Sequence, residues 1–283
     1  MIKKNWISLI LLALCLGVLV GYRMLDRLGT DSRAPEITIS DSGIPEISVY
    51  DTETLLKGVT ATDNRDGDVT SSILVEHVGG ILDDGTVTVT YAAFDRSGNV
   101  AKIQRTVRYT DYESPRFTLK KSLDFIHDTS FDVLNVVGAV DLLDGDIGYR
   151  VKATSVDAES INDEGTHNVQ FRVSNSLGDQ VELVLPVEVY YSGRYNAQLY
   201  LTQYLLYLNI GEAFNPMDYL QEYIARGSGE NLTRGIPESL SLKTEGRVDT
   251  NKPGVYVVSY TMSSTQGNTL YEGYARLIVV VEE

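Results

Sequence analysis

The feature that most constrains the fold of this chain is an internal repeat. When the 283-residue sequence is shifted by 78 positions, LLKGVTATDNRDGDV (55–69) aligns with VLNVVGAVDLLDGDI (133–147). A shift of 80 aligns Tyr91 with Phe171 and Gly98 with Gly178. A third, partial copy occupies 251–268 and lacks the acidic turn of the other two. Recurrence at this spacing predicts tandem small domains rather than one large core.

Within each copy, the hydrophobic pattern is that of β-strands. Apolar side chains occupy alternate positions in TVTVTY (86–91), and similar alternation returns in 167–173 and 255–260. This period of two is typical of a strand with one buried face. The runs are separated by Asp-Gly, Ser-Gly-Asn and Gln-Gly-Asn, which favour turns because Gly and Asn tolerate a positive φ. The pattern predicts an all-β chain of antiparallel β-sandwiches.

A longer frame runs through the first copy and carries a family resemblance. Its positions are Pro35, Gly58, Ala61, Asp63, Asp66 to Thr70, Gly85, Tyr91, Asp95, Ser97 to Asn99 and Arg105 to Val107. In these residues the chain resembles the bacterial immunoglobulin-like (Ig-like) repeats grouped as DUF5011 and as the Ig-like domain of the insecticidal crystal protein Cry22Aa. The resemblance implies cell-surface or secreted spacer and adhesion modules, and it implies no catalytic residues.

The resemblance also sets the expected domain boundaries. It is close across 34–111 and weaker across 112–190, where Asn175 replaces Asp95 and Asp179 replaces Asn99. Only the second half of the frame survives in 191–283. We therefore expect three Ig-like domains, 34–111, 112–190 and a divergent 191–283. The second junction contains Gly193, which predicts a hinge.

The N-terminus predicts a membrane anchor. Residues 6–22 contain 17 positions without a charge, which as a helix would span about 25 Å, near the short limit for a bilayer. A cleavable signal peptide is the alternative, but its apolar core is usually shorter and ends in a site like A-x-A. We expect residues 1–22 to form a cytoplasmic tip and transmembrane helix, 23–33 a linker, and the remainder to be extracellular. Cys15, the only cysteine, is interpreted as a packing residue of this helix.

Composition and motifs argue against two classes of function. The net charge of −15 and the isoelectric point near 4.6 disfavour a nucleic-acid partner, because phosphate binding needs a basic face. The three histidines, His77, His127 and His167, occupy unrelated positions of the repeat. We find no phosphate-binding loop, nucleophile elbow or zinc-protease motif in the sequence. The chain is therefore expected not to be an enzyme.

The acidic turns are the candidate metal ligands. Carboxylates are the hard oxygen donors that Ca²⁺ prefers, and several fall within one turn of each copy and at the first junction. The candidates are Asp63, Asp66, Asp68, Asp141, Asp144, Asp146, Asp111 and Glu113. The alternative is that these carboxylates accept hydrogen bonds from backbone amides, with glycine closing the turn. Weakly bound Ca²⁺ is the only cofactor that the sequence suggests.

The last copy is rich in tyrosine. Twelve of the 18 tyrosines lie from Tyr190 onward, and 199–210 has a strand-like pattern. Residues 215–227 predict a short α-helix, with Asn215 as the N-cap and Gly227 after its end. Tyr271 and Tyr274, taken as exposed, are candidates for binding a sugar or a protein. The alternative is that alternating tyrosines are half-buried packing residues.

These observations predict a membrane-anchored bacterial cell-surface protein of tandem Ig-like modules, acting as a non-catalytic binding or spacer protein in adhesion or envelope interaction. Two alternatives remain open. The first is binding of a glycan or cell-wall polymer through the tyrosine-rich third domain. The second is a role as an accessory subunit of a membrane complex.

Overall fold

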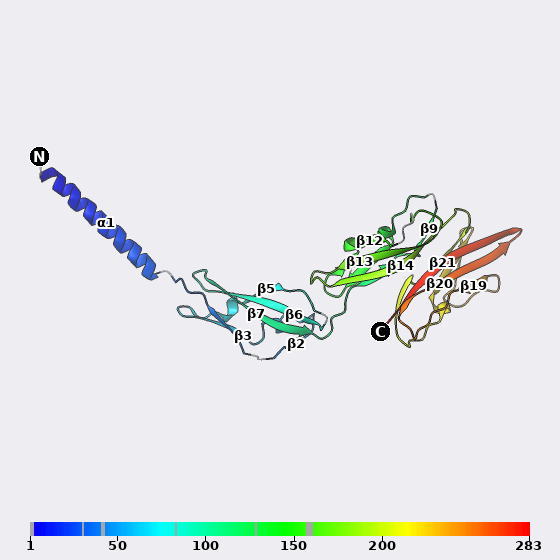
Figure 1. Cartoon of the computed structure of the whole chain (residues 1–283), viewed down its shortest axis with the longest axis horizontal. Coiled ribbons are helices and arrows are strands. Elements are labelled where there is room, and N and C mark those ends of the chain that lie inside the picture. Colours follow the sequence, from blue (N-terminus) through cyan, green and yellow to red (C-terminus); the bar gives the residue numbers. More distant parts are fainter. Residues whose placement is uncertain (1–2, 30, 41–42, 83, 128, 157–160) are drawn as a thin grey trace. The chain divides into compact units, whose positions relative to one another are not determined.

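The chain is mostly β, and the computed structural model describes residues 3–29, 31–40, 43–82, 84–127, 129–156 and 161–283 (Figure 1). Residues 1–2 of the expected cytoplasmic tip lie outside these ranges. The chain forms two compact units, 1–112 and 113–283. The second and third copies of the repeat therefore belong to one unit.

The N-terminal residues form a helix, α1 (Lys3–Gly29), whose described apolar side chains are largely exposed. Within the described part of the chain, no helix combines the length and the apolar character needed to cross a membrane. The expectation of a single-pass membrane protein with an extracellular C-terminal part is thus contradicted. The physical reason is that the uncharged run is short against a hydrocarbon core of about 30 Å, and the helix continues beyond it into charged sequence.

The first copy folds into two facing β-sheets. One has the order β1-β3-β4 and the other the order β2-β7-β6-β5. The bounds are β1 (Glu36–Ile39), β2 (Glu46–Ile47), β3 (Val59–Asp63), β4 (Gly67–Asp68), β5 (Leu74–Val78), β6 (Thr86–Phe94) and β7 (Val100–Tyr109), with 3₁₀ turns η1 (Thr54–Leu56) and η2 (Thr70–Ser72). The predicted alternation is confirmed in β6, where Val87, Val89 and Tyr91 are buried. The Tyr91 hydroxyl donates to the carbonyl of Leu55, 2.6 Å away, which satisfies the only polar atom that this side chain buries.

The second copy repeats this order element by element. Its sheets run β11-β10-β8 and β12-β13-β14-β9. The bounds are β8 (Arg116–Leu119), β9 (Asp124–Ile126), β10 (Val137–Asp141), β11 (Gly145–Asp146), β12 (Lys152–Ser155), β13 (Gly165–Ser174) and β14 (Gln180–Tyr190), with η3 (Val133–Asn135) and η4 (Gly148–Arg150). Phe171 is fully buried at the position of Tyr91 and packs edge-on against Phe117, with ring centroids 6.4 Å apart.

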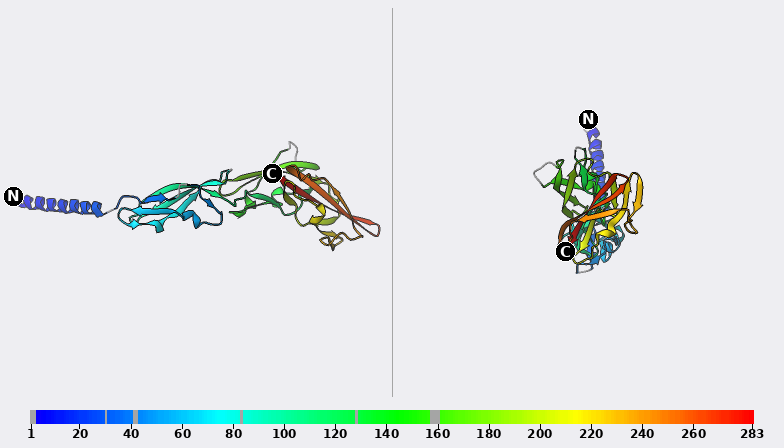
Figure 2. Two further views of the ribbon diagram at one scale, coloured as in Figure 1. Left: turned by 90° about the horizontal axis from the view of Figure 1, so that it is seen from below. Right: turned by 90° about the vertical axis from the view of Figure 1, so that its right-hand side faces the viewer.

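The third copy keeps the strand pairs of the other two, but pairing of β15 with β21 joins its strands into one sheet. The order is β18-β17-β15-β21-β20-β19, and β16 also pairs with β21. The bounds are β15 (Ala197–Leu201), β16 (Leu205–Asn209), η5 (Pro216–Tyr219), β17 (Leu220–Ala225), β18 (Ser228–Asn231), β19 (Ser241–Glu245), β20 (Gly254–Gln266) and β21 (Thr269–Glu282). Figure 2 shows the long β20–β21 hairpin in orange to red beside the yellow strands of the same copy. In all three copies a short second strand pairs in parallel with the last strand: β2 with β7, β9 with β14, and β16 with β21. This shared pairing shows that the divergent last copy has the topology of the other two.

The predicted α-helix at 215–227 is wrong. Asn215 does cap a turn, its side chain accepting from the Met217 amide at 3.2 Å, but the turn is the four-residue η5. The chain then extends as β17 and pairs with β15. Burial of Leu220 and Tyr223 against the sheet outweighs the weak helical preference of so short a segment. Gly227, at φ 79°, forms the β17–β18 hairpin turn instead of ending a helix.

The second and third copies are joined by a packed interface, so Gly193 is not a hinge between separate bodies. Leu205, Ile278 and Val280 of the third copy belong to the hydrophobic core of the second. Arg276, 4% exposed, donates from Nη1 to the carbonyl of Pro186 at 3.2 Å, and its Nε lies 3.4 Å from Glu188 Oε2. These contacts make 113–283 one structural unit.

Candidate functional site

The acidic turns of the first two copies have the same local structure. Asp63, at the end of β3, accepts the amide hydrogens of Arg65 and Asp66 on Oδ1 at 2.7 and 2.8 Å. Asp141, at the end of β10, accepts two amides on Oδ1 in the same way, at 2.9 and 2.8 Å. In the first copy these hydrogen bonds lower the pKa of the Asp63 carboxyl, so it is ionised at neutral pH. Gly67, at φ 72°, supplies the left-handed residue that the turn requires.

Four of the other predicted ligands hold backbone instead of converging on a point. Asp66 Oδ2 accepts from the Arg96 amide at 2.8 Å, and this bond ties the β3–β4 turn to the β6–β7 turn. Asp144 makes the corresponding bond to the Ser176 amide at 2.7 Å. Asp68 and Asp146 each accept, on Oδ1, the amide hydrogen of the first residue of the following 3₁₀ turn. These residues are Thr70 and Gly148, and both distances are 2.9 Å. The backbone-capping alternative describes these four residues.

The junction residues Asp111 and Glu113 are separate from the acidic turns. Asp111 accepts from the Val49 amide at 2.8 Å and from the Ser48 hydroxyl at 2.6 Å, and these bonds lower the pKa of its carboxyl. Glu113 is exposed and begins the second unit. Asp111 therefore serves the first unit as a backbone cap.

A different set of carboxylates does converge, and only one of its members was predicted. Asp31, Asp63 and Asp95 each place a carboxylate oxygen within 4.8 Å of the others. Asp31 lies between α1 and β1, and Asp95 begins the β6–β7 turn. Asp63 and Asp95 are each 8% exposed, so the cluster is mostly withdrawn from water. The structure thus brings together three negative side chains from three well-separated segments of the sequence.

Two oxygens of this cluster have no hydrogen-bond donor in the part of the chain that the structure describes. Asp95 is satisfied by Asn99, whose amide and side-chain nitrogens donate to its two oxygens at 2.8 and 2.6 Å. Asp31 accepts on Oδ1 from the Arg33 amide at 3.0 Å. Asp31 Oδ2 and Asp63 Oδ2 are buried without a hydrogen-bond donor among the described residues. Buried carboxylate oxygens without a donor are costly, which makes this cluster the candidate site for a bound group.

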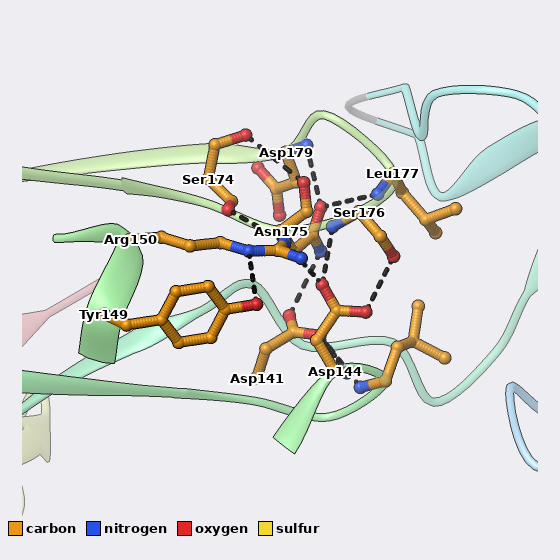
Figure 3. A network of polar contacts seen from close by, with 10 residues as sticks. Asp141, Asp144, Tyr149, Arg150, Ser174, Asn175, Ser176, Leu177 and Asp179 are labelled. Carbon is orange, nitrogen blue, oxygen red and sulfur yellow. Dashed lines mark hydrogen bonds and ion pairs between the residues drawn. The ribbon is translucent and has the colours of Figure 1, made fainter. Parts of the chain in front are cut away.

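The second copy shows how the same position looks when it is filled from within (Figure 3). Asn175 stands where Asp95 stands, and its Nδ2 donates to Asp141 Oδ2 at 3.1 Å. Its own Oδ1 accepts the amides of Leu177 and Asp179, both at 3.0 Å. Arg150 adds an ion pair to Asp144 at 2.9 Å. In the second acidic turn, an amide donor therefore satisfies Asp141 and a guanidinium pairs with Asp144.

Sequence reasoning missed Asp31 and Asp95, although signals for both were present. The same shift that aligns Gly98 with Gly178 aligns Asp31 with Asp111, one of the predicted ligands. The replacement of Asp95 by Asn175 was visible as a mismatch within the repeat. The effect of this replacement depends on the contact between the turn after β13 and the turn after β10, and neither segment alone predicts that contact.

The tyrosine candidates are less exposed than expected. Tyr271 is buried, 9% exposed, and its ring lies beneath the Arg226 guanidinium with 5.3 Å between the guanidinium carbon and the ring centroid. Tyr274 is half-buried, stacks on Tyr195 at 4.6 Å between centroids, and donates its hydroxyl to Glu188 at 2.9 Å. The packing alternative therefore describes both residues better.

Tyr274 nevertheless contributes to a groove between the second and third copies. The groove has a volume of about 450 Å³, and its lining includes Asp124, Tyr190, Tyr200 and Tyr274. Asp124 Oδ1 is buried and has no hydrogen-bond donor among the described residues, and burial raises the pKa of this carboxyl. Burial, followed by the nearby charge of Asp124, raises the pKa of Tyr190 to about 12. The groove thus combines aromatic rings with an unsatisfied acceptor.

The histidines do not assemble with one another or with the acidic clusters in the described part of the chain. His167 is buried in β13 with Nε2 2.7 Å from the carbonyl of Asp163. His77 is exposed on β5, and His127 packs its ring against Tyr191 at 4.8 Å between centroids. The only group of three or more metal-ligating side chains found among the described residues is the Asp31–Asp63–Asp95 cluster.

Comparison with known proteins gives no family assignment. No protein-family model and no curated protein matches the sequence. Among solved structures, Drosophila N-cadherin EC1-3 is 13% identical over 89% of this chain and 90% of its own, with a TM-score of 0.30. The CBM51-2 and INT domains of Clostridium perfringens ZmpB, solved with GlcNAc, are 15% identical over 87% of this chain and 44% of their own, with a TM-score of 0.22.

Other matches cover little of the matched protein. This chain spans 31% of the ZmpB structure that contains the M60 catalytic domain and two CBM51 domains, at 13% identity and a TM-score of 0.22. It spans 45% of the protocadherin GammaB4 extracellular domain, at 11% identity and a TM-score of 0.18. At such TM-scores these similarities give no basis for transferring a ligand or an activity.

Proposed function

We propose that this chain is a non-catalytic binding protein built of tandem Ig-like modules, and that it binds a glycan or cell-wall polymer in the groove between its second and third copies. The observation that carries the proposal is the groove itself, in which tyrosine rings stand beside Asp124, whose Oδ1 has no hydrogen-bond donor among the described residues. The resemblance of the sequence to bacterial surface repeats agrees with a binding or spacer role. It adds no information about the ligand.

The groove has the two kinds of group that recognise a sugar. An aromatic ring offers a flat apolar face for the C–H side of a pyranose, and Tyr200, 38% exposed, presents such a ring. Asp124 also lines the groove, and its carboxylate can accept a hydroxyl hydrogen in a partly buried setting, where a hydrogen bond is stronger than in water. One apolar face beside one fixed acceptor is suited to a polyhydroxylated ligand.

The groove is also held in a defined shape. Arg276 on β21 bonds to main-chain carbonyls of the second copy, and the backbone amide of Arg276 donates to Ser122 Oγ at 2.9 Å. Since both sides of the groove belong to one unit, little ordering is needed before a ligand binds. This rigidity would equally suit a spacer that holds the binding groove at a fixed geometry.

The proposal can be tested by retention of the full-length chain on insoluble bacterial cell-wall polymers, followed by calorimetry with soluble fragments. Tyr200→Ala and Asp124→Ala should each weaken binding about tenfold, which corresponds to about 1.4 kcal/mol for one lost contact. Tyr50→Ala is the matched control, because Tyr50 is 68% exposed on the other unit. If the wild type is not retained on any wall polymer, or the control loses as much as the groove variants, the proposal is wrong. Elution of a stoichiometric protein without polymer would favour a protein partner instead.

A further inference from the structure

We propose that Asp31, Asp63 and Asp95 form a binding site for one divalent cation of the Ca²⁺ class in the first unit. Three carboxylates meet there, two of them 8% exposed, and two of their oxygens are buried without a donor among the described residues. The site differs from the one that the sequence predicts for the first copy, which consists of Asp63, Asp66 and Asp68. It uses one residue of that turn and takes the other two from outside it.

The chemistry of the oxygens and their supply by separate segments favour Ca²⁺. Carboxylate oxygens are hard ligands and suit Ca²⁺ or Mg²⁺ rather than zinc or copper. Asp31, Asp63 and Asp95 each place one oxygen within 4.8 Å of the others, which is close enough for the three to share one cation. Ca²⁺ accepts a flexible coordination geometry, whereas Mg²⁺ demands a near-ideal octahedron, so carboxylates supplied by three separate segments suit Ca²⁺ better. The remaining coordination positions would be taken by water or main-chain carbonyls, as Ca²⁺ commonly allows.

The second copy is an internal control for this assignment. Its acidic turn keeps the same two amide bonds to Oδ1, yet Asp141 Oδ2 is satisfied by Asn175 Nδ2 at 3.1 Å. The third carboxylate is also missing there, because Asp111 is engaged with Val49 and Ser48 of the first unit. The copy that lost the carboxylate gained an internal donor at the same point. The copy that kept the carboxylate has three carboxylates that could hold a cation.

A second difference accompanies the first. Asn99, which donates its side-chain nitrogen to Asp95 Oδ2 at 2.6 Å, is replaced by Asp179 in the second copy. The exchange of Asp95 for Asn and of Asn99 for Asp leaves the charge of the turn unchanged. It moves the carboxylate from the converging position to the neighbouring one. The pair of exchanges therefore converts a cation ligand into an amide donor at constant net charge.

Cation binding would have a local structural effect. Asp31 lies in the segment between α1 and β1, while Asp63 ends β3 and Asp95 follows β6. Asn99 Nδ2 already donates to the main-chain carbonyl of Asp31 at 3.1 Å. A cation shared by the three carboxylates would fasten this entering segment to two turns of the first module. Ca²⁺ would then stabilise the start of the module and leave 113–283 unaffected.

The test is a Ca²⁺ titration of the full-length chain by calorimetry, with thermal unfolding in EDTA and in Ca²⁺. The wild type should bind one Ca²⁺ with a Kd of about 10⁻⁴ to 10⁻³ M, the range of extracellular modules, and its first unit should unfold at a higher temperature in Ca²⁺. The double variant Asp95→Asn with Asn99→Asp should bind at least 100-fold more weakly. In EDTA it should unfold no earlier than the wild type, because its new amide can donate to Asp63. A merely structural role for Asp95 would give a less stable variant and no change in cation binding.

Controls decide between specific binding and general acidity. Glu53→Gln removes an exposed charge of the same unit and should leave Ca²⁺ binding unchanged. Asp63→Asn should abolish Ca²⁺ binding. If this variant is less stable than the wild type, Tb³⁺ luminescence with Ca²⁺ competition measures cation binding independently of unfolding. Absence of Ca²⁺ binding by the wild type at 10 mM, about ten times the expected Kd, would overturn the proposal. So would undiminished binding by the double variant, or a Mg²⁺ affinity equal to that for Ca²⁺.

Discussion

Asn175→Asp in the second copy is the most informative single substitution for this account of the acidic turns. The change keeps the side-chain shape and the oxygen that accepts the amides of Leu177 and Asp179. It replaces the Nδ2 donor, 3.1 Å from Asp141 Oδ2, by a carboxylate oxygen facing another carboxylate. Asn175 is 5% exposed and Asp141 7% exposed, so water cannot separate the two groups without opening the turn.

The magnitude follows from the contact distance and from the cost of a proton. Losing a hydrogen bond to a charged group costs about 2 kcal/mol, and two charges at 3.1 Å repel by about 5 kcal/mol at an effective dielectric constant near 20. The protein can avoid this sum by protonating the introduced carboxyl, which costs about 4 kcal/mol at pH 7 for an unperturbed pKa near 3.9. The protonated group can then donate to Asp141. The expected loss in free energy of unfolding is therefore about 4 kcal/mol at pH 7.

The loss of stability in Asn175→Asp should depend on pH. The folded variant would hold one proton that the unfolded chain releases above about pH 4, so the pKa of the introduced group is raised on folding. An acid whose pKa is raised on folding destabilises the protein at high pH, and the loss should shrink by about 1.4 kcal/mol per unit as the pH falls toward 4.

Urea unfolding of the full-length chain at pH 7 and pH 5, followed by circular dichroism, measures this loss for the transition of 113–283. Gln221→Glu is the matched control, since it makes the same change of charge at an exposed position of β17 in the same unit. A loss below about 1 kcal/mol at pH 7 would mean that the Asn175–Asp141 contact contributes little beyond a single hydrogen bond. A loss that is the same at both pH values would contradict the proton-sharing argument.

Two further predictions concern the module interface and the first acidic turn. Arg276→Met should lower the free energy of unfolding of 113–283 by about 3 kcal/mol, because Glu188 would lose its buried cationic partner; calorimetry would measure this, and a change below about 1 kcal/mol would contradict it. In EDTA, the stability that amide hydrogen bonds to Asp63 confer should be present above about pH 4 and lost as the pH falls through the lowered pKa of this carboxyl. Unfolding temperatures of the wild type and Asp63→Asn should therefore converge at low pH, and a constant difference would refute the assignment.

The repeat and its strands could be predicted because their signals are local. Alternation in 86–91 reports one buried face whatever lies opposite, and Tyr91 and Phe171 occupy the same buried place in two copies. The glycines at the ends of the acidic turns could also be predicted, since few residues other than glycine adopt the left-handed backbone conformation found there. These features depend on neighbours close by in the sequence.

The wrong or missing predictions concern features that depend on contacts between residues far apart in the sequence. Residues 215–227 carry real capping signals, but pairing of β17 with β15 decides their conformation, and that pairing is invisible in the segment alone. Gly193 suggested a hinge because no local pattern shows that Arg276, far later in the chain, will bond to Pro186. Asp31 and Asp95 were missed for the same reason: a metal site is defined by which turns meet.

The three copies show three solutions to the problem posed by one tight turn. In the first copy, Oδ2 of Asp63 is buried without a donor among the described residues. In the second copy, Asn175 donates to the corresponding oxygen of Asp141. In the third copy, the hairpin turn Arg226-Gly227 replaces the acidic turn. A buried carboxylate oxygen is tolerated only where something compensates it, so the first solution is incomplete without an external cation. Only the first copy should respond to Ca²⁺, although all three share one strand pairing scheme. In this chain the fold is repeated three times, and the chemistry of each copy depends on one or two residues at the turns.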